Sequence, residues 1–239
     1  MKCISVINHI KNQDVNLITK AHTLGKYNFI LGVEDARLLN GNLSRLNMLY
    51  SLGVRILTLN WRGDSIIGGG WDTSLPLTSF GKAVINKCND LGIIIDLSHS
   101  SYEVFYDAIN FAKKFSFSPI ASHSNSFSIC NHKRNLTDNQ FKELCNLKSI
   151  VGISFVPEHL GDNASIDTII RHINHLLELG GENTIALGSD FDGVDRLPKG
   201  INSIEDINSL YSALICEFGD KITNKIFFEN AYSYFKRNL

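Results

Sequence analysis

Short, nearly continuous apolar runs alternate with amphipathic stretches along most of the chain. The apolar runs predict six strands, and their lack of polar positions is typical of strands buried on both faces. These strands are expected at residues 27–32, 55–60, 92–97, 119–122, 150–155 and 184–188. The amphipathic spacing predicts helices at residues 43–51, 79–90, 102–114, 138–146, 166–179, 203–217 and 221–237.

Residues at the ends of these stretches support the assignment. Thr78 and Thr137 precede predicted helices as N-caps, and a glycine follows three of the helices where a helix should stop, at Gly53, Gly92 and Gly180. The order strand, helix, strand predicts an α/β fold with parallel pairing through right-handed crossovers. The first 26 residues suggest helix and loop, with no convincing strand. No break in composition marks a second domain, so we expect one domain over residues 1–239.

Six strand–helix units leave the architecture open. A closed barrel of this kind has eight units and typically about 250 residues. Either the sheet is open or incomplete, or two units are missing and belong before residue 1.

The composition excludes several classes of protein. With 44% hydrophobic residues, 239 residues can bury a sizeable core. The balance of 23 basic and 24 acidic side chains gives no electrostatic signature of nucleic-acid binding. The apolar runs are far shorter than the roughly 20 residues of a membrane helix, and no signal peptide is evident. Five cysteines without CxxC spacing suit reduced thiols. We therefore expect a cytoplasmic protein without a membrane segment.

Four polar residues follow predicted strands directly: Glu34, His99, His123 and Asp190. Taken singly, a histidine there is more often a hydrogen-bonded structural residue, and an aspartate often caps the next helix. Taken together, they converge on the edge of a parallel sheet where ligands bind. Two imidazoles and a carboxylate form a zinc ligand set, and a further aspartate can carry a proton.

Several long motifs resemble one family, the membrane (renal) dipeptidase family of zinc peptidases. They occur in order from about Phe29 to the C-terminus: GVEDARLLNG, LGVRILTLNW, LTSFGKAVINKCNDLGIIIDLSHSS, PIASHSNSFSICNHKRNLTD and ALGSDFDGV. The resemblance implies a TIM-like (β/α)₈ barrel, a binuclear zinc centre and hydrolysis of small dipeptides.

The resemblance also implies a role for each matching residue. Glu34 corresponds to the carboxylate that bridges the two zinc ions, and His99 and His123 to the histidines of the second zinc. Arg134 corresponds to the arginine that binds the C-terminal carboxylate of the substrate, a task suited to a guanidinium. Asp190 corresponds to the aspartate that passes a proton to the leaving amine.

The sequence departs from the family at two places. Trp61 stands where some members have a substrate-binding histidine. None of the eight histidines is followed two residues later by Asp, so the His-x-Asp pair of the first zinc site is missing. We therefore expect an N-terminally shortened member, an incomplete barrel with six of eight units, and ligands for one zinc ion.

Three functions stay open on this evidence. The first is a zinc dipeptidase, and Arg134 favours a substrate with a free carboxylate. The second is a weak or inactive remnant that binds a metal or a partner chain, with exposed sheet edges that favour a homo-oligomer. The third is another metal-dependent hydrolase, such as a lactonase or deaminase. Two further histidines, His172 and His175, are expected to be solvated or packed.

Overall fold

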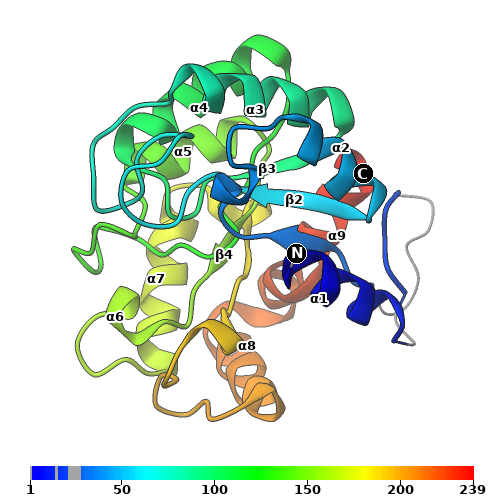
Figure 1. Cartoon of the computed structure of the whole chain (residues 1–239). Helices are drawn as coiled ribbons and strands as arrows, with labels where there is room; N and C mark the ends of the chain where they lie inside the picture. Colours follow the sequence, from blue (N-terminus) through cyan, green and yellow to red (C-terminus); the bar gives the residue numbers. More distant parts are fainter. Residues whose placement is uncertain (1, 14–15, 21–27) are drawn as a thin grey trace. The chain divides into compact units, whose positions relative to one another are not determined.

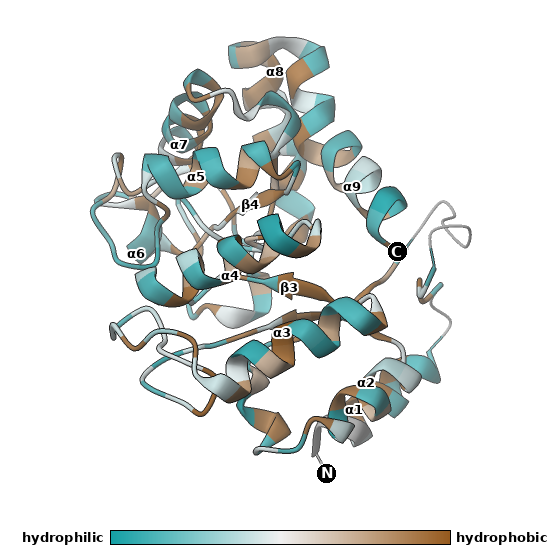
Figure 2. Ribbon diagram, turned by 90° about the horizontal axis from the view of Figure 1, so that it is seen from above, coloured by the Kyte–Doolittle hydropathy of each residue, from teal (hydrophilic) through white to brown (hydrophobic). Residues whose placement is uncertain are grey.

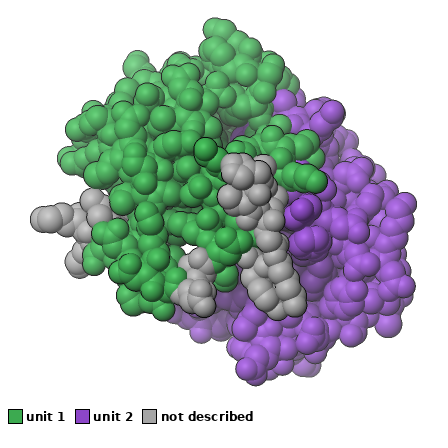
Figure 3. Space-filling model, turned by 90° about the vertical axis from the view of Figure 1, so that its right-hand side faces the viewer, with its two compact units in different colours: residues 1–118, 235–239 green, residues 119–234 purple. Residues whose placement is uncertain are grey.

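A computed structural model describes residues 2–13, 16–20 and 28–239 of the chain. These residues divide into two compact units, residues 1–118 with 235–239 and residues 119–234 (Figure 3). The first residue of the strand predicted at 27–32 lies outside the described part. Each unit alternates strands and helices, as the sequence predicted.

The first unit contains a three-stranded parallel sheet. Its strands are β1 (Leu31–Val33), β2 (Val54–Thr58) and β3 (Ile94–Asp96), in the order β1-β2-β3. Thr58 lies opposite Asp96 in the register, so the carboxyl ends of β2 and β3 meet at one edge. All three strands are shorter than predicted, because the flanking residues turn away to begin the loops that carry the polar side chains.

Helices connect the strands of this sheet. They are α2 (Ser44–Ser51), between β1 and β2, α3 (Ser79–Leu91), between β2 and β3, and α4 (Tyr102–Phe115), after β3 (Figure 1). Figure 2 shows hydrophilic and hydrophobic positions alternating along α3 and α4, as expected for helices with one buried face. The predicted cap at Thr78 is present, since its hydroxyl accepts a hydrogen bond from the Gly81 amide at 3.0 Å.

The N-terminal segment contains helix α1 (Lys2–Lys11), in agreement with the sequence prediction. The loop after it differs from the prediction, because Leu17 forms a single parallel bridge with Phe29. The Ile18 amide donates to the Phe29 carbonyl at 2.7 Å, and the Phe29 amide donates to the Asn16 carbonyl at 3.0 Å. This pairing precedes β1 along the chain.

The second unit contains the parallel pair β4 (Val151–Ile153) and β5 (Ile185–Leu187). The strand predicted at 119–122 is reduced to one bridge, between Ala121 and Val151. Pro119 has no amide hydrogen to donate, which limits how far this segment can pair. The described residues thus form five strands and this bridge where the sequence predicted six strands.

The helices of the second unit are α5 (Asp138–Asn146), α6 (Pro157–Leu160), α7 (Ile166–Glu178) and α8 (Ile207–Asn224). Helix α9 (Asn230–Asn238) begins in this unit, and its residues from 235 onward belong to the first. The helix predicted at 203–217 instead begins at Ile207, after a 3₁₀ turn over Ile204–Asp206, and extends to Asn224. Gly219 interrupts α8 with a φ of 76°, close to the boundary predicted between the last two helices. A π-helical turn, Lys225–Glu229, then leads into α9.

The apolar faces of the elements fill a core in each unit. Leu46, Val84 and Ile95 are buried in the first unit, and Phe141 and Ile173 in the second. The helices therefore use their apolar residues for internal packing. Among the described residues, no helix is both long and apolar enough to cross a bilayer.

Candidate active site

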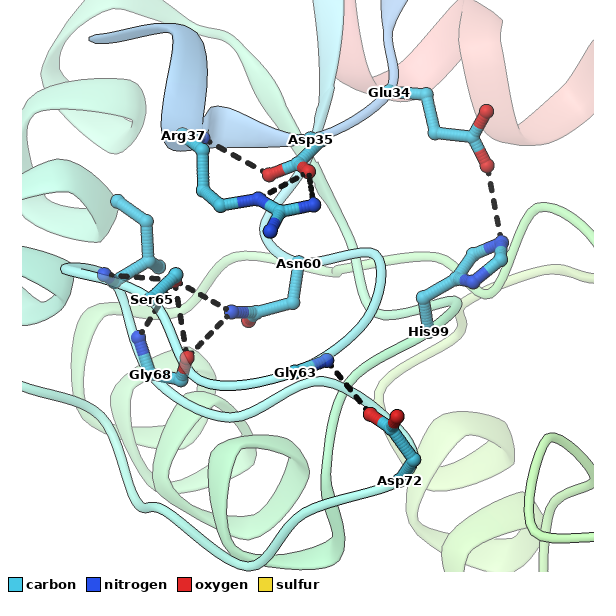
Figure 4. A network of polar contacts seen from close by, with 10 residues as sticks. Glu34, Asp35, Arg37, Asn60, Gly63, Ser65, Gly68, Asp72 and His99 are labelled. Carbon is cyan, nitrogen blue, oxygen red and sulfur yellow. Dashed lines mark hydrogen bonds and ion pairs between the residues drawn. The ribbon is translucent and has the colours of Figure 1, made fainter. Parts of the chain in front are cut away.

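Two candidate metal ligands lie together in the first unit. Glu34 follows β1 directly and His99 follows β3 by three residues, so both stand at the carboxyl edge of the sheet. The Nε2 atom of His99 lies 3.0 Å from the Oε1 atom of Glu34 (Figure 4). The His99 side chain is 10% exposed, whereas Glu34 is half-exposed at 51%. An imidazole and a carboxylate thus face each other at the edge predicted to carry ligands.

The turn that carries His99 has an unusual backbone. His99 has a φ of 67°, a conformation that costs a non-glycine residue on the order of 1 kcal/mol or more. Buried Asp96 holds the residues before it, because its carboxylate accepts from the Thr58 hydroxyl at 2.7 Å and from the Ser98 amide at 3.0 Å. The sheet therefore fixes the position from which His99 projects.

Trp61 lies in the loop after β2, in the same unit. Its ring centroid is 6.3 Å from that of His99, with the two planes inclined by 42°. The side chain is 48% exposed. The structure therefore brings three of the predicted site residues together in the first unit: Glu34, His99 and Trp61.

Short-range hydrogen bonds hold this loop (Figure 4). The Asp72 carboxylate accepts from the Gly63 amide at 2.7 Å and from Arg62 Nε at 3.0 Å. The Gly63 amide, and secondarily Arg62, hold the pKa of the Asp72 carboxyl below its ordinary value. Ser65 makes a second local set, accepting from the Ile67 amide at 3.1 Å and donating to the Gly68 carbonyl at 3.0 Å.

The second unit contains His123 and Arg134, which also lie together. His123 is 9% exposed, and its Nδ1 atom lies 2.8 Å from the Ser122 hydroxyl. The guanidinium of Arg134, a residue that is 5% exposed, donates to the His123 carbonyl at 3.1 Å. The arginine side chain is thus held against the backbone of a candidate metal ligand.

Asp190 follows β5 by three residues, with a φ of 58°. Its carbonyl accepts from the Gly193 amide at 3.0 Å, which begins a short 3₁₀ turn. The bridge at Ala121 and the pairing of β4 with β5 are both parallel, so the segments leading into His123 and Asp190 run in the same direction. Both residues therefore stand at the carboxyl edge of the second unit's strands.

Asn125, which the sequence analysis did not select, organises the segment after His123. It is fully buried, and its side-chain amide pairs twice with the backbone of Ser154. Nδ2 donates to the Ser154 carbonyl, and Oδ1 accepts from the Ser154 amide, both at 3.0 Å. The partner lies 29 residues away in sequence, so no local pattern could have revealed this role.

His172 is packed rather than solvated, which resolves the two readings of this residue. The ring accepts from the Ser126 amide at Nδ1, at 3.1 Å, and donates from Nε2 to the Leu160 carbonyl, at 3.2 Å. These two bonds require the neutral Nε2–H tautomer. Burial lowers the pKa of His172 to about 4. His175 is part-buried, with Nε2 at 2.9 Å from the Asp138 carboxylate.

A cavity of about 1060 Å³ opens in the second unit between the segments at 130–132, 157–167 and 196–200. His132 lines it and accepts a hydrogen bond from the Arg134 amide at 3.2 Å. Burial, and then the charge of Arg134, lower the pKa of His132. An exposed ion pair at 2.8 Å joins Glu158 and Arg196 among the lining residues, and such exposed pairs contribute little stability.

The sequence profile of membrane dipeptidases, Peptidase family M19, matches residues 8–237. The chain belongs to this family. Two uncharacterized dipeptidases of Schizosaccharomyces pombe are 35% and 32% identical over 205 and 202 residues, each matching 81% of the chain. These matches cover 47% and 48% of the relatives, so the chain spans about half the length of the curated relatives it matches.

Two solved structures of metallopeptidases are similar to nearly the whole chain. The dipeptidase AC, a metallopeptidase of family M19, matches with a TM-score of 0.90 at 26% identity, over 98% of this chain and 76% of that one. A metallopeptidase from Rhodobacter sphaeroides, liganded with a phosphinate mimic of the dipeptide L-Ala-D-Ala, matches with a TM-score of 0.88 at 27% identity. That match covers 97% of this chain and 71% of that one. The α/β fold is thus that of the M19 dipeptidase structures.

Proposed function

We propose that the chain acts in the metal-dependent hydrolysis of dipeptides, with zinc as the metal. The observation that carries the proposal is the Glu34–His99 pair, a carboxylate oxygen and an imidazole nitrogen 3.0 Å apart at one sheet edge. Family membership supports it, because M19 enzymes are metallopeptidases. This pair is suited to a divalent cation that accepts both oxygen and nitrogen ligands, which zinc does.

Three residues form the proposed ligand set: Glu34, His99 and His123. Nδ1 of His123 interacts with Ser122, so Nε2 is the nitrogen proposed to bind the metal. When bound, zinc lowers the pKa of a water molecule and polarises the carbonyl of the substrate. The 239 residues contain no His-x-Asp pair, so we propose one tightly bound ion rather than the family's two.

Three further residues are proposed to act on the substrate. Arg134 binds its C-terminal carboxylate, because a guanidinium offers two parallel donors to a carboxylate. Asp190 accepts a proton from the attacking water and passes it to the nitrogen that leaves as an amine, a role that requires a carboxyl group within reach of both atoms. Trp61 contacts the substrate near the scissile bond.

We further propose that residues 1–239 form a single TIM-like barrel domain with six of the eight strand–helix units. The parallel strands with intervening helices in each unit support this architecture. The similarity to M19 dipeptidase structures over nearly the whole chain supports it as well.

Metal binding is the first test of the proposal. Equilibrium dialysis with zinc, followed by elemental analysis, should give about one ion per chain, and His99→Ala should lose most of it. The matched control is His9→Ala, which removes an exposed histidine from helix α1 and should leave the zinc content unchanged. Zinc retained by His99→Ala would contradict the ligand set.

Hydrolysis of a dipeptide panel tests the reaction itself. Zinc-dependent release of free amino acids should fall at least a hundredfold in Asp190→Asn, a typical loss for a proton-transfer group. Arg134→Lys should mainly raise KM, since a lysine binds a carboxylate as a single point charge. Zinc binding without cleavage of any dipeptide would favour the remnant, and cleavage of lactones alone would favour another hydrolase.

A further inference from the structure

The loop after β2 presents an exposed aromatic ring near His99, one member of the Glu34–His99 pair. Trp61 is 48% exposed, although its ring lies only 6.3 Å from that of His99. A single exposed aromatic residue is ordinary on a protein surface. A ring next to a candidate metal ligand, however, lies where it can contact a bound substrate.

Residues on both sides of Trp61 are fixed by hydrogen bonds. On the N-terminal side, Asn60 is 1% exposed and its side chain donates to the Gly68 carbonyl at 3.0 Å. On the C-terminal side, Asp72 accepts from Arg62. It also accepts from the Gly63 amide, as Figure 4 shows. The chain is therefore held at positions 60, 62 and 63, on both sides of Trp61.

A glycine completes this anchoring. The Gly70 amide donates to the Gly63 carbonyl at 2.8 Å. Any side chain at Gly70 would overlap the backbone of Arg62, so this close approach depends on glycine. The GGG run at 68–70 thus closes the loop that presents Trp61.

We propose that Trp61 makes the enzyme prefer dipeptides whose N-terminal residue has an apolar, above all aromatic, side chain. The proposal rests on the function proposed above. The scissile carbonyl belongs to the N-terminal residue, so the side chain of that residue begins two bonds from the carbonyl carbon that would react near Glu34 and His99. Aromatic rings attract each other at centroid distances of about 4.5–7 Å. An aromatic side chain of a substrate bound next to His99 can approach the Trp61 ring within this range.

The charges around Trp61 disfavour a basic side chain. The charge of the half-exposed Glu34 carboxylate would be balanced by the proposed zinc ion, so Glu34 would not attract a basic group. On the other side, Arg62 follows Trp61 directly and would repel a basic one, although its pairing with Asp72 reduces this effect. A basic side chain that stacks on the indole is the competing possibility, and the substrate panel includes it.

Hydrolysis of Phe-Gly, Gly-Gly and Lys-Gly by the full chain with zinc tests the preference. Trp61→Ala should lower the ratio of kcat/KM for Phe-Gly over Gly-Gly by roughly twofold to tenfold, the range of one aromatic pair. The matched control is Trp71→Phe, the other tryptophan of the chain, which should leave the ratio unchanged. An equal loss for both substrates, or a Lys-Gly preference lost in Trp61→Ala, would overturn the proposal.

Binding without turnover separates this proposal from the function it rests on. In Trp71→Phe, Trp61 is the only tryptophan and reports on its own surroundings by fluorescence. Phosphinate analogues of Phe-Gly and Gly-Gly serve as uncleaved probes. We expect the Phe analogue to shift the emission at a concentration at least fivefold lower. This result without any hydrolysis would refute the dipeptidase but retain the role of Trp61. Cleavage of dipeptides together with equal affinity for both analogues would refute the role of Trp61 but retain the dipeptidase. If the chain showed no binding and no cleavage, both proposals would be refuted.

Discussion

The loop at 60–72 in the first unit and the segment at 123–136 in the second are built differently, although both carry proposed site residues. In the loop, Asp72 bonds to residues nine and ten positions away, and Ser65 to residues two and three positions away. In the segment at 123–136, Asn125 bonds to a residue 29 positions away, and Ser126 to one 46 positions away. The side-chain bonds of the loop are local, although its backbone also pairs with a distant segment, since the Ser101 amide donates to the Gly69 carbonyl at 3.0 Å. The buried side chains of the second segment bond to distant parts of its unit.

The two regions also differ in exposure, and this decides what each bond contributes. The side chains of Arg62 and Asp72 are 64% and 25% exposed, so water can replace their interaction when it is lost. Asn125 is fully buried, and loss of its amide leaves buried backbone groups without partners. We therefore expect a substitution of buried Asn125 to cost much more stability than one of Asp72.

The largest effect is expected for Asn125→Ala. It removes both hydrogen bonds to Ser154 and buries an unpaired amide and carbonyl, at a cost of about 4 kcal/mol in the free energy of unfolding. Urea unfolding followed by circular dichroism measures this difference. Asn131→Ala, an exposed asparagine of the same segment, is the control and should change stability by less than about 0.5 kcal/mol. Equal losses of unfolding free energy in the two variants would contradict the expectation that the buried hydrogen bonds of Asn125 contribute more.

The next effect concerns His172 and pH. Its pKa of about 4 in the folded state lies below the ordinary value of 6.5, so the unfolded chain binds the proton more readily. The neutral ring therefore contributes stability fully above about pH 6.5, and this contribution is lost as the pH falls toward 4. From the shift we expect a loss on the order of 3 kcal/mol over that window.

His172→Gln provides the comparison for this prediction. Its side-chain oxygen can accept from the Ser126 amide and its nitrogen can donate to the Leu160 carbonyl, but the group does not titrate in this range. Unfolding free energies measured from pH 7 to pH 4 should therefore fall less steeply in the variant than in the wild type. Parallel curves would show that another group controls the acid sensitivity of this unit.

The smallest effect on stability is expected in the loop of the first unit. Asp72→Ala removes an exposed ion pair and should cost about 1 kcal/mol or less. The main consequence is expected to be a more mobile loop, because Arg62 and Gly63 both lose their hydrogen bond to the Asp72 carboxylate. In the Trp71→Phe background, the fluorescence anisotropy of Trp61 should fall, whereas Lys82→Ala on helix α3 should leave it unchanged. Unchanged anisotropy in Asp72→Ala would show that Gly70 and Asn60 suffice to hold the ring.

Much of the fold could be predicted from local pattern. Helices α3, α5 and α7 lie within one residue of their predicted bounds, because each has a side-chain cap and an amphipathic stripe. The segment at 119–122 was wrongly predicted to be a full strand. Its apolar residues are typical of a strand, but Pro119 has no amide hydrogen to donate, and the segment forms only one bridge. Helix α8 starts four residues late, because Ser203 caps a 3₁₀ turn before the helix begins.

The sequence by itself determined the residue types of the candidate site and their placement after strands. Parallel strands bring their carboxyl ends to a common edge, so Glu34 and His99 could be placed together before any coordinates. That inference needs only strand direction and order, which the alternation of strands and helices supplies.

Only the tertiary structure decided which side chains hold these residues in place. Asn125 and His172 have no local signature, because a buried polar group is recognised by its partners, and their partners lie 29 and 46 residues away. The same holds for Arg134, whose guanidinium is held by the His123 carbonyl. The sequence specifies the type and order of the residues. Which groups pair with each buried donor and acceptor is decided only by the packing of the folded chain.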